Sequence, residues 1–227
     1  MQEITSLLIT ALAVIVGIVV HETAHALVAY ALGDATARSR GRVSLNPLNH
    51  IDPFGTVLLP LLMMLAGGPV FAFAKPVPVY LNNLKHPKRD EVLVALAGPA
   101  SNIILAALAA GLWRLIPADG GALAPILATS FGYHLANFVF TFISVNLSLA
   151  FFNLIPLPPL DGSSVLVLFL KGRALRTYYE IQRYSMPILI IVLYLLPMVF
   201  HIDLIDIYFS FTLYPVAEML FAFAMGL

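Results

Sequence analysis

The run His21-Glu22-Thr23-Ala24-His25 contains residue types that bind metals and move protons. Two histidines four positions apart lie on one face of a helix, about one turn apart, which is the spacing that two zinc ligands need. Glu22 lies beside such an ion, where a carboxylate takes a proton from water that the metal activates. A chance pentapeptide on a soluble helix is the alternative. The flanking residues are apolar, and ionisable side chains at membrane depth need a partner, so the pattern favours a metal.

The composition is that of an integral membrane protein. The chain has 227 residues, of which 60% are hydrophobic and 11% charged, whereas a soluble domain has about 45–50% apolar and about 25% charged residues. The formal net charge is zero, so nothing points to a nucleic-acid partner. There are no cysteines, so zinc ligands must be His, Asp or Glu. The first apolar run follows only three residues and lacks a basic leader, so we expect a retained transmembrane helix.

The long apolar stretches predict the membrane-spanning elements, because about 20 residues are needed to cross a bilayer as a helix. Spans are predicted over residues 4–33, 92–116 and 130–155, and two further membrane segments over residues 187–200 and 205–226.

Two stretches predict elements other than a straight span. Residues 57–74 are interrupted by prolines and glycines, which favours a re-entrant hairpin. The alternation from Ala37 to Leu45 favours a short strand or hairpin. The expected fold class is therefore an all-α, multi-span bundle. It has a three-helix core, about two to three additional membrane segments and a small re-entrant or β-hairpin element on the cytoplasmic side.

The basic residues predict the orientation. Eleven of the twelve Lys and Arg residues lie in the loops 34–90 and 163–186, which should therefore face the cytoplasm. The histidine pair then lies in the cytoplasmic half of the first span. The end of the 130–155 span lies on the same side, so Asp161 is expected at a similar depth.

Asp161 is the best candidate for a third metal ligand, because a catalytic zinc usually has three protein ligands and one open position. The residue follows a proline-rich break and precedes Gly162. The alternative is an aspartate that caps a helix beginning at Gly162. The matching depth of the histidine pair favours the ligand.

Together these motifs resemble the site-2 protease family of intramembrane zinc metalloproteases, peptidase family M50. That family pairs His-Glu-x-x-His with Asn-x-x-Pro-x-x-x-Leu-Asp-Gly, which this chain carries as residues 153–162. Residues 46–55 (NPLNHIDPFG), 75–79 (KPVPV) and 98–102 (GPASN) also match. In length the chain is most similar to short bacterial members without PDZ or CBS domains.

The resemblance implies roles for particular residues. His21, His25 and Asp161 would bind one Zn²⁺ per chain, and Glu22 would be the general base. Asn153 would lie near the metal and hold the substrate carbonyl or its oxyanion. Its position alone favours a hydrogen bond between helices instead. Lys75, Pro76, Val77, Pro78 and Val79 would lie near the substrate path and pair with an extended substrate.

The resemblance also implies the setting of the reaction. The expected partners are a transmembrane protein substrate and the lipid bilayer, in a bacterial inner membrane with the active site toward the cytoplasm. We expect one domain, residues 1–227, with a core over 4–162 and extra membrane segments over 187–226. The rival hypothesis is an ion or proton pathway, or a metal-binding membrane protein without catalysis.

Overall fold

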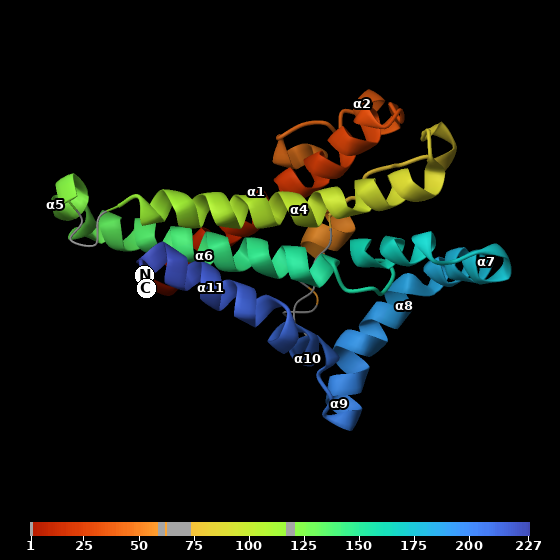
Figure 1. Ribbon diagram of the computed structural model, residues 1–227. Helices are drawn as coiled ribbons and strands as arrows, with labels where there is room; N and C mark the ends of the chain where they lie inside the picture. Colours follow the sequence, from red (N-terminus) through yellow and green to blue (C-terminus); the bar gives the residue numbers. More distant parts are fainter. Residues whose placement is uncertain (1, 59–61, 63–73, 117–120) are drawn as a thin grey trace.

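Three long helices lie side by side at the centre of the molecule (Figure 1). The computed structural model describes residues 2–58, 62, 74–116 and 121–227. The central helices are α1 (Gln2–Ala31), α4 (Pro87–Arg114) and α6 (Ser130–Asn153). They confirm the predicted three-helix core, and the described residues contain no β-strand.

Helix α4 begins earlier than its apolar pattern predicts. Pro87 occupies the start of the helix, where its fixed φ is suited to the first turn and its missing N–H costs no helical hydrogen bond. The charged residues that follow, from Lys88 to Glu91, form its first turn. Hydropathy alone therefore placed the helix start too late.

Within the part of the chain that the structure describes, four helices are long and apolar enough to cross a membrane, namely α1, α4, α6 and the helical stretch Gly172–Phe200. The pair α10 (Leu204–Phe211) and α11 (Leu213–Met225), bent by 45°, makes a fifth if it counts as one span. Large apolar side chains on the outer faces are exposed, such as Leu7 at 69% and Leu112 at 67%. Such surfaces are covered by lipid in a bilayer, so the fold is that of a multi-pass membrane protein.

The C-terminal half adds helices to one side of the core (Figure 1). Helix α11 packs on α4 and α6 through a buried cluster that comprises Ala106, Ala110, Ile143, Leu147, Leu213 and Ala224. The stretch 172–200 consists of α7 (Gly172–Ile181), η6 (Gln182–Tyr184), α8 (Ser185–Ile190), η7 (Ile191–Leu195) and α9 (Leu196–Phe200). Pro187 lies in the first turn of α8, where a proline does not interrupt a helix. The membrane segment predicted from residue 187 therefore continues the amphipathic helix before it.

The remaining short elements connect the long helices. They are α2 (Thr36–Ser39), η1 (Pro47–Asn49), η2 (Pro53–Leu58), η3 (Leu81–Asn83), η4 (Gly121–Leu123), α5 (Ala124–Leu127) and η5 (Asp161–Leu168).

The strand or hairpin predicted from Ala37 to Leu45 is wrong, because α2 and turns occupy that segment. The carboxylate of Asp34 accepts hydrogen bonds from Thr36 N at 3.0 Å and Thr36 Oγ1 at 2.5 Å, which favours a helical turn here. Ala37 is fully buried inside that turn. Alternation over so few residues does not separate a strand from a short helix. The predicted re-entrant element, residues 57–74, falls mainly outside the described residues.

Asp34 joins the loop after α1 to the loop before α4. Its carboxylate is fully buried and also accepts hydrogen bonds from Tyr80 N at 2.6 Å and Asn83 Nδ2 at 2.9 Å. Burial raises the pKa of Asp34, but the hydrogen bonds from Asn83, Thr36 and Tyr80 outweigh burial and lower that pKa to about 2. A permanently ionised carboxylate thus holds the two loops together at neutral pH.

Candidate metal centre

His21 and His25 lie one turn apart on α1 and turn their rings toward α4. Both side chains are buried, and their ring centroids are 4.6 Å apart. His21 Nδ1 lies 2.6 Å from Asn102 Oδ1, and His25 Nδ1 lies 2.7 Å from the carbonyl oxygen of Val94. Because an oxygen faces each Nδ1, we assign the proton to Nδ1 in both rings. Each Nε2 is then left with a free lone pair, as a metal ligand requires.

The carboxylate of Asp161, which is distant in the sequence, lies close to both Nε2 atoms. Its Oδ2 lies 3.1 Å from His21 Nε2 and 3.4 Å from His25 Nε2. The residue opens η5, and the N-cap of η5 is Leu160, without a side-chain capping bond. The carboxylate therefore faces the histidines, and the capping alternative is not what the structure contains.

These three side chains fit a divalent metal. Their ligand atoms lie within 4.8 Å of one another. Asp161 Oδ2 is buried and has no hydrogen-bond partner among the described residues. Bonds of about 2.0–2.1 Å in a tetrahedron place neighbouring ligand atoms about 3.3–3.4 Å apart, close to the separations found here. Two lone pairs and a carboxylate oxygen at these distances repel one another unless a metal ion or a proton lies between them.

Gly98 on α4 gives the two imidazoles their space. A Cβ atom built at this position would lie 2.4 Å from His25 Nε2 and 2.5 Å from His21 Nε2. No side chain fits there without moving the rings. In the sequence Gly98 stands out only as part of the stretch 98–102, so its position against the ligand atoms was not predicted.

Two buried asparagines connect the histidine pair to the bundle. Asn102 Nδ2 donates to Gly17 O at 3.1 Å and to Asn146 Oδ1 at 2.8 Å, and Asn146 Nδ2 donates to Phe142 O at 2.9 Å. The network links α1, α4 and α6 next to the site. Neither asparagine had a predicted role. The available signal was an amide in the middle of an apolar span, where polar groups are costly and need partners.

Replacing Asn102 with alanine is expected to weaken zinc binding by about 10–100-fold, because partners that orient a ligating histidine contribute that much to metal affinity. The measurement is competition with a calibrated zinc chelator on the purified protein. Ser101→Ala is the matched control, because Ser101 Oγ donates only to Gly98 O of its own helix. An unchanged zinc affinity in Asn102→Ala would mean that this bond does not orient His21 for a metal.

A cavity of about 740 Å³ opens beside the three candidate ligands. Glu22 is partly exposed and lines it, as do Asn153, Pro76, Val77 and Val79. Lys75 and Pro78 are not among its described lining residues.

Asn153 extends into this cavity from the end of α6. Its Nδ2 donates to Leu149 O at 3.0 Å, within its own helix. This bond lies within α6 and is not the bond between helices that the position of Asn153 favoured.

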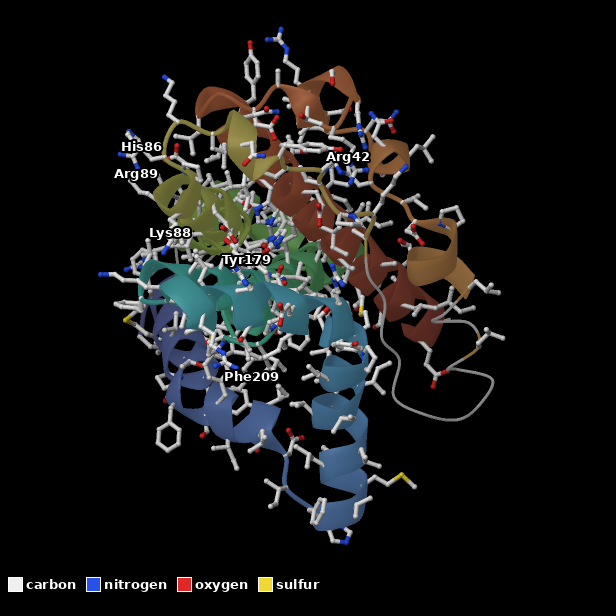
Figure 2. The ribbon with its side chains drawn as sticks, turned by 90° about the vertical axis from the view of Figure 1, so that its right-hand side faces the viewer. Arg42, His86, Lys88, Arg89, Tyr179 and Phe209 are labelled. Carbon is white, nitrogen blue, oxygen red and sulfur yellow. The ribbon has the colours of Figure 1, made fainter. Side chains whose placement is uncertain are left out.

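The opposite wall of the cavity comes from α7, η6 and α8, which the sequence analysis did not place at the site. Tyr179 Oη donates to Glu91 Oε2 at 2.8 Å, and Lys88 Nζ donates to Leu170 O at 2.7 Å. These bonds hold the C-terminal helices against α4, with Lys88 and Tyr179 at the same end of the molecule (Figure 2).

Comparisons with known proteins agree on one family. The profile of peptidase family M50 matches residues 9–196. The chain is 44% identical over 152 residues to "Putative zinc metalloprotease YwhC" of Bacillus subtilis, covering 67% of this chain and 64% of the relative. It is 30% identical over 175 residues to "Putative zinc metalloprotease Rip2" of Mycolicibacterium smegmatis, covering 76% and 61%. The match to Rip2 of Mycobacterium tuberculosis has 28% identity over 185 residues and covers 81% and 65%. The chain thus spans just under two thirds of the length of these relatives, and no solved structure matches it.

Proposed function

This chain belongs to peptidase family M50, and from that premise we propose that it is a zinc metalloprotease that hydrolyses peptide bonds within or near transmembrane segments of membrane proteins. The observation that carries the proposal is the meeting of His21, His25 and Asp161 at one buried point beside a cavity. The names of the relatives support zinc as the metal.

We propose that these three side chains hold one zinc ion per chain. When bound, zinc polarises a carbonyl oxygen and lowers the pKa of its bound water to about 7. Two imidazole nitrogens and one carboxylate oxygen form a common donor set for a catalytic zinc, which usually keeps a further position for water or substrate.

Glu22 is the proposed general base. It lies next to His21 in the chain and lines the cavity, so its carboxylate can accept the proton of the attacking water. The same carboxylate then passes that proton to the leaving amine.

Asn153 is the proposed donor to the substrate carbonyl. An amide carries two N–H groups, and the bond to Leu149 O uses one of them. The second is available to an oxyanion, which preorganised donors stabilise as negative charge develops.

The substrate must be locally unwound at the cleaved bond, because a helical carbonyl is already hydrogen-bonded and shielded by its own turn. We propose that residues 75–79 receive the unwound segment along the cavity wall. The many Lys and Arg residues in the loops 34–90 and 163–186 support a site toward the cytoplasm. The bacterial relatives support a bacterial inner membrane.

Glu22→Gln tests the proposal. The probe is a set of labelled single-span peptides with glycine or proline in the apolar segment, cleaved by zinc-loaded protein in detergent. Loss of a general base is expected to slow cleavage by about 10²–10⁴-fold, while the zinc content stays unchanged. Glu3→Gln, on the exposed opposite end of α1, is the control and should cleave normally.

Two other outcomes would contradict the proposal. Undiminished cleavage by Glu22→Gln would exclude Glu22 as the base. If the wild type cleaves no peptide but conducts protons across liposome membranes, the site is an ion pathway instead.

A further inference from the structure

We propose that Arg42 and Asp34 are positioning residues that hold the segment 75–80 at both ends, so that Val77 and Val79 present their backbone N–H groups to an extended substrate. This inference rests on the proposed proteolytic function and adds to it the residues that set the docking edge. We call the arrangement the two-ended clamp.

Arg42 forms the first end of the two-ended clamp. Its side chain is only 4% exposed, and its guanidinium donates to Asn49 O and Lys75 O. Lys75 N in turn donates to His50 O at 2.9 Å. Both backbone polar groups of Lys75 are therefore bound by the loop 42–50. Figure 2 shows Arg42 within this layer of loops.

The guanidinium of Arg42 can bridge two backbone carbonyls in a way that other side chains cannot. A buried cation is costly unless its N–H groups are bonded, and Arg42 uses two of them on main-chain carbonyls from separate segments. The planar fork of a guanidinium bridges two acceptors in a fixed geometry, which a lysine does not reproduce. Arg42 therefore fixes where the segment 75–80 begins.

Asp34 forms the second end. Its Oδ2 accepts from Tyr80 N at 2.6 Å, while its Oδ1 accepts from Asn83 Nδ2 at 2.9 Å. Tyr80 is in an extended conformation and directly precedes η3. Two buried charged side chains, one from each side of α2, thus fix the start and the end of the same segment.

The residues between these two ends have backbone N–H groups that a substrate strand could bind. Pro76 and Pro78 have no N–H, and a proline restricts the residue before it to an extended conformation. In an extended chain the N–H groups of residues two apart point the same way, so an extended segment 75–80 would present those of Val77 and Val79 on one edge. Neither N–H has a hydrogen-bond partner among the described residues. Such an edge suits a substrate that adds as a strand.

The two-ended clamp is expected to act on substrate binding. A segment that is already ordered loses little conformational entropy when the substrate docks. Loss of the clamp should therefore lower the affinity for substrate more than it lowers the rate of the chemical step. Arg42 and Asp34 do not line the cavity among its described residues. Arg42 does interact electrostatically with Glu22, whereas Asp34→Asn leaves that charge in place, so Asp34→Asn is the variant in which the chemistry itself should remain.

Amide hydrogen exchange without substrate tests whether the clamp exists. The segment 75–80 has four exchangeable amides, and in wild type those of Lys75 and Tyr80 should be protected while those of Val77 and Val79 exchange freely. Arg42→Met should release Lys75 selectively, and Asp34→Asn should release Tyr80. Arg40→Met, an exposed arginine of the same loop, is the control. Unchanged protection of Lys75 in Arg42→Met would overturn the clamp.

Substrate binding tests what the clamp does. In Glu22→Gln, which holds the probe peptide without turnover, Val77 and Val79 should become protected when the peptide is added. In the active enzyme, Arg42→Met should raise KM by about tenfold, the loss expected for one or two weakened hydrogen bonds. Asp34→Asn should raise KM in the same way with little change in kcat, because it keeps the charge of Arg42 near Glu22. Arg42→Lys should recover part of that loss, and zinc content should equal that of wild type.

Different outcomes would exclude the proposed function and the two-ended clamp. If wild type cleaves no peptide, the proposed function fails, while the exchange pattern still decides whether the clamp is present. Suppose instead that wild type cleaves the peptide, that the Lys75 amide loses its protection in Arg42→Met, and that KM does not change. The clamp then exists but does not position the substrate, and the inference is wrong.

Discussion

Replacing Asp161 with alanine is expected to strip zinc from the purified protein and to abolish cleavage of the probe peptides. Asp161 provides the only oxygen of the three-residue set and the only contribution from outside α1. The loss of affinity should exceed the about 10–100-fold that follows removal of an outer partner. The remaining histidines would hold a metal through two nitrogens on one helix, which leaves coordination incomplete.

Elemental analysis of zinc per chain measures this effect without any substrate. Wild type should hold about one zinc ion, as a closed set of three ligands predicts. Asp203→Ala is a suitable control, because Asp203 caps α10 through Ile205 N and Asp206 N and is exposed. Equal zinc in wild type and Asp161→Ala would remove Asp161 from the ligand set.

The second large effect is expected from Gly98→Ala, which adds one methyl group next to the candidate metal ligands. Gly98→Ala would place a Cβ atom 2.4 Å from His25 Nε2, so the rings must move or α4 must shift away from α1. Overpacking of this kind costs about 1–3 kcal/mol. Because both Nε2 atoms face the intruding methyl, we expect loss of zinc binding together with loss of cleavage.

Gly111→Ala provides a matched control for Gly98→Ala on the same helix. A Cβ atom at Gly111 meets no atom within 4 Å, and alanine is favoured over glycine in a helix by about 0.5–1 kcal/mol. This variant should bind zinc normally and unfold at the same or a higher temperature. Normal zinc binding by Gly98→Ala would show that the rings have room that the structure does not indicate.

Features that depend on neighbouring residues, such as the spans and the spacing of the two histidines, could be predicted from the sequence. The three core spans were predicted because hydropathy over a span reports its burial in lipid, and the structure confirms them. The pairing of His21 with His25 follows from the helical repeat alone. Their meeting with Asp161 was expected because charged loops set which ends of the spans share a side of the membrane.

Local structure that depends on contacts with distant residues could not be predicted from the sequence. The segment after α1 forms α2 rather than a strand because Asp34 binds Thr36, Tyr80 and Asn83, and no local pattern shows those contacts. The start of α4 was missed because its first turn is charged. Hydropathy follows the apolar part of a helix and not its ends.

The sequence by itself determined the spans and the helical spacing of the candidate ligands on α1, and it predicted the side of the membrane on which they lie. All of these depend on short-range periodicity and on transfer between water and lipid. Only the tertiary structure decided which atoms meet. The space left by Gly98 beside the imidazoles, the bonds from Asn102 to His21 and Asn146, and the hold of Arg42 on Lys75 each join separate segments. Such contacts arise from the packing of one helix or loop against another, for which a single sequence carries no local signal.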